Sequence, residues 1–359
     1  MNKAQNFSEF YDCLEMGGLV STNIIYGDAN DTIFYIDNGN FPFRDRAYDW
    51  KKVLPGDTSA TLWEDFHSTE ELVQVLQPSS GYVFNTNNTP FNSSGPLDNP
   101  RRRDYDPTLG NYQYDNNRSL RVVEIMAGHD KITWEDFLNL KYDQQYPDSL
   151  YIFFMENPDD ILKLDKSDYP ELAEEIDILK EWDKKGHSES IGASIWLVTA
   201  QYLFEKISKR HEFFKRNYIS HDEIAEAMLK GKKHLEKHFG SNRVPLGEVQ
   251  RLVRGDNDYP LSGLQDQIAS MRSVKWEDGR FEGELGESYI QLIRFSEKGI
   301  QVQSSINFGA SNRKESPHYN DQVDLHINKK LKEMRFEKEW IMENAESVYH
   351  PGEDPKPAK

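Results

Sequence analysis

The amino-acid sequence predicts an α+β fold with a helical middle segment and strands near both ends. Two runs rich in β-branched residues, 22–26 and 32–36, flank the polar turn 27–31 and are typical of a hairpin. Helical spacing dominates the centre of the chain, and alternation with a period of two returns over 289–306. Strands near both ends with helices between them favour a layered arrangement, in which the terminal strands can share a sheet.

The first predicted element is an amphipathic helix close to the start of the chain. Ser8 lies near its beginning, and its apolar side chains follow the i, i+3, i+4, i+7 spacing: Phe7, Phe10, Tyr11 and Leu14. The residues before it are polar and contain no hydrophobic leader. Because the chain opens so abruptly, we expect it to be the later part of a longer polypeptide.

Helices are predicted through the centre of the chain. Thr133 with Asp136, and Ser220 with Glu223, have the spacing of capping boxes. Apolar residues mark one face of a helix between these boxes: Leu172, Ile176, Leu179 and Trp182. The apolar run 191–204 is shorter than the roughly 20 residues that a membrane-spanning helix requires, so we predict a buried helix and no membrane span.

The composition restricts the classes of function. Apolar residues make up 37% of the 359 residues, enough for a substantial core, and the length is compatible with one domain or two. The net charge of −18 repels phosphate groups, so we expect no nucleic-acid partner and no attachment to anionic lipid. The basic run 101–103 is more typical of a solvated loop than of a phosphate contact.

Metal and thiol chemistry have little support in the sequence. Cys13 is the only cysteine, which excludes an intramolecular disulfide, and its place in the first helix is typical of a packed thiol. His234 and His238 have a spacing that can grip a metal ion, but three neighbouring lysines repel a dication and favour a solvated helix face. We therefore expect no metal ion and no cofactor in this chain.

The candidate chemistry lies in the long irregular segment 77–115, because the sequence contains no Gly-x-Ser-x-Gly elbow, Walker loop, Gly-x-Gly-x-x-Gly or His-Glu-x-x-His. Asn85, Asn87 and Asn88 cluster there, after the short apolar strand predicted at 82–84. A side-chain amide has two neutral N–H donors and no proton to lose, so it can stabilise a developing oxyanion without acting as a base. The alternative is that these asparagines satisfy backbone groups in a turn.

At this loop the sequence resembles the penicillin amidase family, the penicillin acylases and acyl-homoserine-lactone acylases of the N-terminal-nucleophile hydrolase superfamily. The resemblance implies part of the layered αββα fold of that superfamily, with residues 1–350 as the C-terminal portion of the catalytic β subunit and 351–359 as a flexible tail. The similar segments follow the order of the family: NKAQNFSEFYD at 2–12, NIIYGDANDTIFY at 23–35, LPG at 54–56, PSSGY at 78–82, NTNN at 85–88, RVVEI at 121–125, PLGEVQRL at 245–252 and SPHYNDQ at 316–322.

The resemblance also implies roles for individual residues. In this family an N-terminal serine attacks the acyl carbonyl with its own α-amine as general base, and a backbone N–H and an asparagine hold the oxyanion. By position, Asn87 matches that asparagine, and Asn85 supports its loop. Arg121 matches an arginine near the oxyanion asparagine that helps to orient it. Thr22 matches a position lining the acyl pocket; the alternative for it is an ordinary strand residue.

The chain departs from the family pattern in three places. The nucleophilic serine and the calcium-binding acids of the family belong upstream of Asn2, so the resemblance implies that any structural calcium binds the parent enzyme through residues absent here. Asp31 stands where the family usually has a turn glycine, although an aspartate still tolerates the left-handed conformation. Leu246 stands where a tryptophan is common.

Two hypotheses about function follow from these observations. The first is a fragment of an amidohydrolase that cleaves an acyl group from a linear amide, inactive alone, whose partners are a small acylated amide, the N-terminal part and the α subunit of the same precursor. The resemblance implies a periplasmic or secreted parent. The second is a non-catalytic binding protein that keeps the acylase scaffold and holds its ligand in an aromatic-lined pocket.

Overall fold

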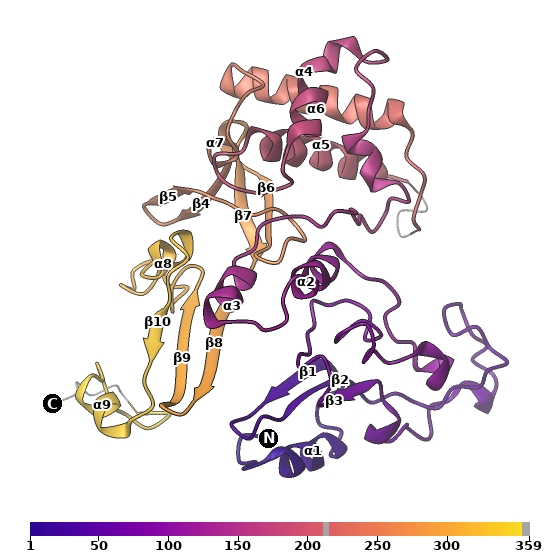
Figure 1. Ribbon diagram of the computed structural model, residues 1–359, viewed down its shortest axis with the longest axis vertical. Helices are drawn as coiled ribbons and strands as arrows, with labels where there is room; N and C mark the ends of the chain where they lie inside the picture. Colours follow the sequence, from indigo (N-terminus) through magenta and orange to yellow (C-terminus); the bar gives the residue numbers. More distant parts are fainter. Residues whose placement is uncertain (211–214, 354–359) are drawn as a thin grey trace.

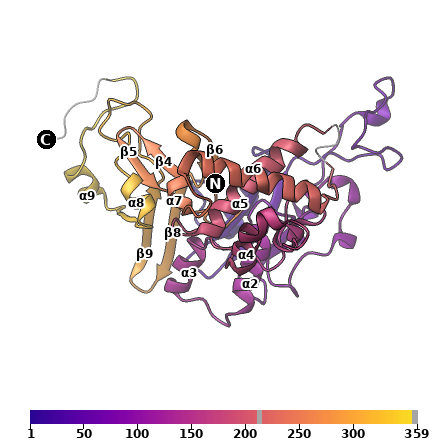
Figure 2. The same cartoon turned by 90° about the horizontal axis from the view of Figure 1, so that it is seen from above.

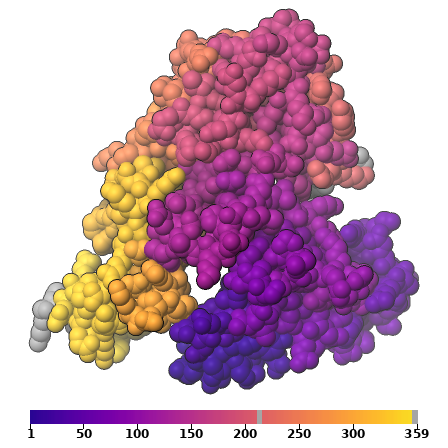
Figure 3. Space-filling model, viewed as in Figure 1, coloured from indigo at the N-terminus to yellow at the C-terminus, as the bar shows by residue number. Residues whose placement is uncertain are grey.

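The computed structural model describes residues 1–210 and 215–353. A helical block occupies one end of the long axis, and the N-terminal strands and the C-terminal strands extend from it side by side at the other (Figure 1). An open notch separates these two extensions on the face shown in Figure 3. The predicted α+β class, with a helical middle and strands near both ends, is confirmed.

The N-terminal part combines one helix with a three-stranded sheet. α1 (Phe7–Glu15) begins behind Asn6, its N-cap, whose side chain accepts from the backbone N of Glu9. β1 (Ser21–Gly27) and β2 (Ile33–Gly39) form the predicted antiparallel hairpin, and β3 (Gln74–Leu76) adds to β2. The apolar face of α1 packs on this sheet around the buried Phe34 and Ile36. Asp31 takes the left-handed conformation at the hairpin turn, with φ of 60°.

The segment between β3 and the helical block is largely irregular, as predicted. Only an isolated bridge between Val83 and Ser94 forms where a strand was predicted at 82–84. Two helices end the segment: α2 (Asn117–Ala127) and α3 (Trp134–Lys141), which starts with the predicted capping box. Short 3-10 helices punctuate the chain before α2: η1 (Ser59–Thr61), η2 (Thr69–Glu71), η3 (Arg102–Asp104) and η4 (Pro107–Leu109).

The helical block contains the largest apolar core of the described chain. α5 (Ile191–Ile207) lies at its centre, packed between α4 (Ala173–Glu181) and α6 (His221–Phe239). Three shorter helices flank them: η5 (Pro158–Leu162), η6 (Pro170–Leu172) and α7 (Leu246–Val249). α6 begins with the predicted capping box of Ser220 and Glu223. Among the described residues, no helix has the length and apolar character needed to cross a membrane.

Two further sheets follow the helical block. The first, of order β5-β4-β7-β6, was not predicted; it contains β4 (Gln250–Arg254), β5 (Asn257–Pro260), β6 (Met271–Lys275) and β7 (Phe281–Gly286), with η7 (Glu277–Gly279) before β7. The second, of order β10-β9-β8, contains the predicted hairpin of β8 (Tyr289–Ser296) and β9 (Gly299–Ile306), with β10 (Lys332–Met334) at its edge.

The C-terminal strands and the N-terminal strands lie in separate sheets, so the shared sheet considered from the sequence does not form among the described residues. Seen along the long axis, the C-terminal part and the violet loops of the N-terminal part project to opposite sides (Figure 2). α8 (Val323–Ile327) and α9 (Lys338–Glu343) complete the chain. Most of the flexible tail predicted at 351–359, namely 354–359, lies outside the described residues.

Candidate functional site

The asparagine loop turns sharply at Asn87. The backbone N of Asn87 donates to Asn85 Oδ1 at 3.0 Å, which closes a local turn between the two residues. Asn87 has φ of 62°, a left-handed conformation that asparagine tolerates better than most residues. Its side chain is exposed at the tip of the loop. The local backbone therefore presents Asn87 to solvent and leaves Asn85 underneath it.

Asn88 is a structural residue of the same loop. Its side chain is 2% exposed, and its Oδ1 accepts from both the backbone N and the hydroxyl of Thr86, at 2.9 Å and 3.0 Å. Its Nδ2 donates to the backbone carbonyls of Thr89 and Asn92, at 3.0 Å and 2.6 Å. The turn-satisfying role considered from the sequence thus applies to Asn88, which has every polar atom engaged.

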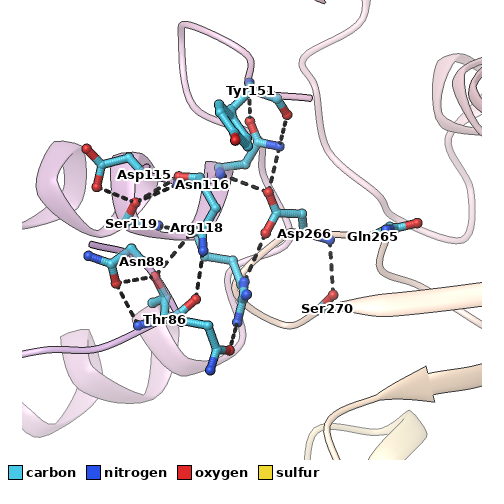
Figure 4. A network of polar contacts seen from close by, with 12 residues as sticks. Thr86, Asn88, Asp115, Asn116, Arg118, Ser119, Tyr151, Gln265, Asp266 and Ser270 are labelled. Atoms are coloured by element: carbon cyan, nitrogen blue, oxygen red, sulfur yellow. Dashed lines mark hydrogen bonds and ion pairs between the residues drawn. The ribbon is translucent and has the colours of Figure 1, made fainter. Parts of the chain in front are cut away.

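The side chain of Asn87 is held at one end only. Its Oδ1 accepts from Arg118 Nη1 at 3.2 Å, whereas its Nδ2 has no hydrogen-bond partner among the described residues. Figure 4 shows Arg118 reaching from α2 toward the loop that carries Thr86 and Asn88. Because Arg118 fixes the carbonyl oxygen of the Asn87 side chain, the two N–H donors of the amide face away from Arg118. They are available to an incoming group.

Arg118 is itself positioned by Asp266, a residue 148 positions later in the chain. Arg118 Nε donates to Asp266 Oδ1 at 3.0 Å, and Asp266 Oδ2 accepts from the backbone N and the side chain of Asn117 at 2.9 Å and 3.0 Å. Burial raises the pKa of Asp266, and the Asn117 backbone and Arg118 oppose that rise. The carboxylate therefore joins the start of α2 to the loop before β6.

The start of α2 is also tied to the asparagine loop. Asn116, the N-cap of α2, accepts from the backbone N of Ser119. Its Nδ2 donates to the backbone carbonyl of Thr86 at 2.7 Å, and its Oδ1 accepts from the Thr86 hydroxyl at 3.1 Å. One capping residue thus fixes the helix end and the loop together, so the distance between Arg118 and Asn87 is set by the backbone.

Arg118 donates the hydrogen bond to Asn87 Oδ1, and the role expected of Arg121 stays a prediction. Arg121 forms a two-pronged ion pair with Asp143, at 3.1 Å and 3.0 Å, and also contacts Glu124 and Gln145. Burial would lower the pKa of Arg121, but the contacts with Asp143 and Glu124 together outweigh burial and raise it. No hydrogen bond between the described atoms joins Arg121 to Asn87. The two arginines lie three residues apart on the same helix, so sequence position alone did not separate them.

Thr22 lies on the side of the N-terminal sheet that faces α1. It is exposed and pairs with Asn38 in the hairpin register. Alternation along β1 places it on the same face as Ile24, which packs against α1. The neighbouring Asn23 lies on the opposite face, where its Oδ1 accepts from the Tyr35 hydroxyl at 2.7 Å. The structure therefore places Thr22 on the other side of the strand from Tyr35, and the pocket role expected of Thr22 stays a prediction.

Asn85 carries an unusual buried atom beside this face. Its Nδ2 is buried and lacks an aligned hydrogen-bond acceptor among the described residues, although its side chain lies close enough to influence the Tyr35 hydroxyl. A buried donor without an acceptor costs about 1–3 kcal/mol. Asn85 therefore stabilises the turn through its Oδ1, while its Nδ2 is left without an aligned acceptor.

The histidine pair of α6 has structural partners. His234 Nε2 lies 2.6 Å from the backbone carbonyl of Gly279, and its Nδ1 lies 3.1 Å from the Tyr202 hydroxyl. The ring of His238 packs beside it, and burial lowers the pKa of His234. His234 is therefore partly buried in a structural contact, whereas His238 is exposed, as expected of a solvated helix face. In the described part of the chain, no group of three His, Cys, Asp or Glu side chains could hold a metal ion.

Comparisons with known proteins show the family to which the chain is similar. A family model described as penicillin amidase matches residues 1–343. An acyl-homoserine lactone acylase PvdQ of Pseudomonas fluorescens is 25% identical over 183 residues, and a penicillin G acylase of Escherichia coli is 33% identical over 88 residues. These alignments cover 45% and 24% of this chain but only 23% and 10% of the two relatives, so the chain matches a minor part of their length.

A solved structure shares the fold over nearly the whole chain. The thermostable penicillin G acylase from Alcaligenes faecalis superimposes with a TM-score of 0.60 at 17% sequence identity. The superposition covers 99% of this chain and 71% of that one. At this level of identity the similarity establishes the fold and leaves the chemistry to be argued from the residues.

Proposed function

Because this chain belongs to the penicillin amidase family, we propose that it forms part of an acylase that hydrolyses the C–N bond of a linear amide and releases its acyl group. The relatives named acyl-homoserine lactone acylase and penicillin G acylase support this class of reaction. Because the chain matches a minor part of their length, the proposal concerns the assembled enzyme, and the chain alone is expected to be inactive.

The proposed reaction proceeds through an acyl-enzyme. A serine at the N-terminus of a segment outside this chain attacks the acyl carbonyl, and its proton passes to its own α-amine. The carbonyl π electrons move onto oxygen and form a tetrahedral oxyanion. Collapse of this intermediate breaks the C–N bond, the leaving amine takes the proton from the α-amine, and water then hydrolyses the ester by the same route.

One observation carries the proposal: the amide Nδ2 of Asn87 is exposed and without a partner among the described residues, while its Oδ1 is held by Arg118. This arrangement presents a neutral donor in a fixed direction, which is what the stabilisation of an oxyanion requires. We assign Asn87 as the oxyanion donor, Asn85 as the residue that holds its turn, and Arg118 as the residue that orients its carbonyl.

A buried donor in the loop supports a site that another segment completes. Asn85 Nδ2 is buried without an aligned acceptor among the described residues. We assign the missing partners to the N-terminal part and the α subunit of a common precursor, exported to the periplasm or secreted. Any structural calcium of that parent then binds through residues outside this chain.

The alternative of a non-catalytic binding protein requires an aromatic-lined pocket. The cavity between α8 and β6 has a single aromatic residue, Tyr142, in its wall. This cavity gives the binding-protein alternative no support. An in-frame extension upstream of the Met1 codon, with a cleavage junction before a serine, is expected for the acylase; a stop codon and ribosome-binding site there would favour the binding protein.

The turnover of the complete enzyme tests the proposal. Asn87→Ala should lower kcat by about 100- to 1,000-fold with KM changed little, because removal of one oxyanion donor costs about 2.7–4 kcal/mol in the transition state. Asn30→Ala, an exposed asparagine of the β1–β2 turn, is the matched control and should keep full turnover. A change in kcat of less than threefold in Asn87→Ala would show that the assignment is wrong.

A further inference from the structure

A second site is suggested by a cavity of about 240 Å³ on the other side of the loop before β6. It holds the volume of roughly eight water molecules, and it is smaller than the pockets of about 300–1,000 Å³ that take drug-sized ligands. The walls come from the end of α3, the loops around β5 and β6, and α8. The lining residues that matter below are Tyr142, Leu261, Met271, Glu287, His326 and Lys329.

Two polar atoms in the wall are buried without partners. The Tyr142 hydroxyl and His326 Nδ1 are shielded from solvent and make no hydrogen bond with the described residues. Each would cost about 1–3 kcal/mol if left unsatisfied, so both groups call for a hydrogen-bond partner within the cavity. Both groups can donate to an oxygen, since the burial of His326 and the nearby Lys141 lower its pKa to about 4 and leave it neutral.

Lys329 brings a cation without a carboxylate partner to the same wall. Its Nζ donates to Gln144 Oε1 at 3.0 Å, and no ion pair joins it to an acid among the described residues. Burial lowers the pKa of Lys329, and the charge of Asp143, which is paired with Arg121, opposes that shift only in part. Lys329 is exposed to solvent, and its ammonium group lies beside the neutral amide of Gln144.

The acids of the cavity wall already have partners. Glu287 forms an ion pair with Lys141, and burial lowers the pKa of that lysine to about 8. Glu189 accepts from the Ser188 hydroxyl at 2.8 Å and forms no ion pair with the described residues. Lys329 is the wall cation without an ion pair in the described chain. An anion bound at Lys329 would supply such a pair.

The remaining wall is apolar. Leu261 and Met271 are 2% and 4% exposed and belong to the small core beneath the sheet of β4 to β7. Ile327 packs against the same core from α8. A ligand with one charged end and a short hydrocarbon tail would satisfy both sides of the cavity.

We propose that this cavity binds a small monocarboxylate with a short apolar chain, whose oxygens accept from Lys329, Tyr142 and His326 and whose tail packs on Leu261 and Met271. The site is separate from the asparagine loop and does not rest on the proposed acylase activity. The two regions share one wall, because Ser270 lines the cavity and its hydroxyl accepts from the backbone N of Asp266 at 3.1 Å.

Ligand-observed NMR titration of the complete enzyme with sodium butyrate tests this proposal, at ionic strength held constant with sodium chloride. Butyrate should bind saturably. 1-Butanol, which has the same tail without the charge, and inorganic phosphate, which has the charge without the tail, should bind at least tenfold more weakly. If butyrate shows no saturation, or if phosphate binds equally well, a monocarboxylate site is contradicted.

Variants then locate the site. Lys329→Met should raise the butyrate Kd at least tenfold, whereas Lys330→Met, at the exposed next residue, should leave it unchanged. Tyr142→Phe removes only a hydroxyl that has no protein partner, so it should fold normally and raise the Kd about fivefold. Asn87→Ala should keep butyrate binding, which separates this site from the active site. Equal affinity in Lys329→Met, Tyr142→Phe and the unmodified enzyme would overturn the proposal.

Discussion

The helical block and the asparagine loop are stabilised in different ways. The block buries a continuous apolar core in which Val198, Leu203 and Ile207 are fully shielded from solvent. The loop depends on polar contacts between distant segments, and both Asn87 and Asp266 adopt the left-handed conformation. The first arrangement tolerates small shifts of side chains because apolar contacts are not directional, whereas the second fixes one amide in one orientation.

The difference predicts how substitutions divide between stability and activity. Changes in the helical block should lower the free energy of unfolding and leave the turnover of folded enzyme unchanged. Changes in the polar chain from Asp266 to Asn87 should lower turnover more than they lower stability. The predictions below test this division.

The largest effect on stability is expected in the helical block. Leu203→Ala should lower the free energy of unfolding by about 2–5 kcal/mol, because a fully buried leucine leaves a cavity when truncated. Urea denaturation of the complete enzyme measures this loss. Leu97→Ala is the control, since Leu97 is 98% exposed and its truncation should cost under about 0.5 kcal/mol. Equal losses of unfolding free energy in Leu203→Ala and Leu97→Ala would contradict the role given to the buried core.

A smaller effect, on turnover, is expected in the polar chain. Arg118→Met should lower kcat about tenfold, or ~1.4 kcal/mol, because Asn87 loses the cation that orients its carbonyl. The KM should change less than threefold. Arg121→Met is the matched control on the same helix, and its main effect should be on stability through the loss of the Asp143 pair. A larger loss of kcat in Arg121→Met than in Arg118→Met would favour the orienting role for Arg121, as expected from the sequence, over Arg118.

Helix caps allow the same change to be made in both regions. Ser220→Ala, at the start of α6, should cost about 1 kcal/mol of stability and no turnover. Asn116→Ala, at the start of α2, should cost a similar amount and also lower kcat, because Asn116 holds the Thr86 backbone as well as the helix. If both variants left kcat unchanged, the loop would not depend on α2 as described.

The smallest expected effect is on the pH dependence of stability, through an ion pair in the loops near the asparagine segment. Burial would raise the pKa of Asp106, but its bonds from Arg46 and the Thr108 backbone outweigh burial and lower the pKa to about 2. Because the folded-state pKa is depressed, the stabilisation is present above the unfolded value of 3.8 and is lost as pH falls through about 2.

This contribution is about 1 kcal/mol or less, since Arg46 is 69% exposed. Asp106→Asn should therefore lower the urea midpoint slightly at pH 6 and leave it equal to that of the unmodified enzyme near pH 2. A difference that grew at low pH would have the wrong sign and would contradict the assignment of the pair.

Local patterns predicted much of the fold. The capping box of Ser220 and Glu223 and the hairpin after Ser21 depend on neighbouring residues, and both formed as predicted. The sheet of β4 to β7 was missed because its central pair is parallel and joins residues about thirty positions apart. Local alternation cannot show such a pairing.

The candidate site around Asn87 was predictable only in part, because its contacts also join residues that lie far apart in the sequence. The resemblance identified Asn87 by position, and the structure shows its amide exposed at the tip of the loop. The partner of Arg118 is Asp266, 148 residues later, and no local pattern connects them. Arg121 was chosen because it stood in the similar segment, while the choice between two arginines one helical turn apart depends on tertiary contacts.

The central claim is that the free amide of Asn87 faces the reacting oxygen. A crystal structure of the complete enzyme with an acyl-mimicking boronic acid, which forms a tetrahedral adduct with a catalytic serine, tests it directly. We predict a distance of about 2.7–3.1 Å between Asn87 Nδ2 and one boronate oxygen, the range of a working oxyanion donor. A boronate oxygen held by other donors, with Asn87 Nδ2 beyond hydrogen-bond reach, would contradict the account.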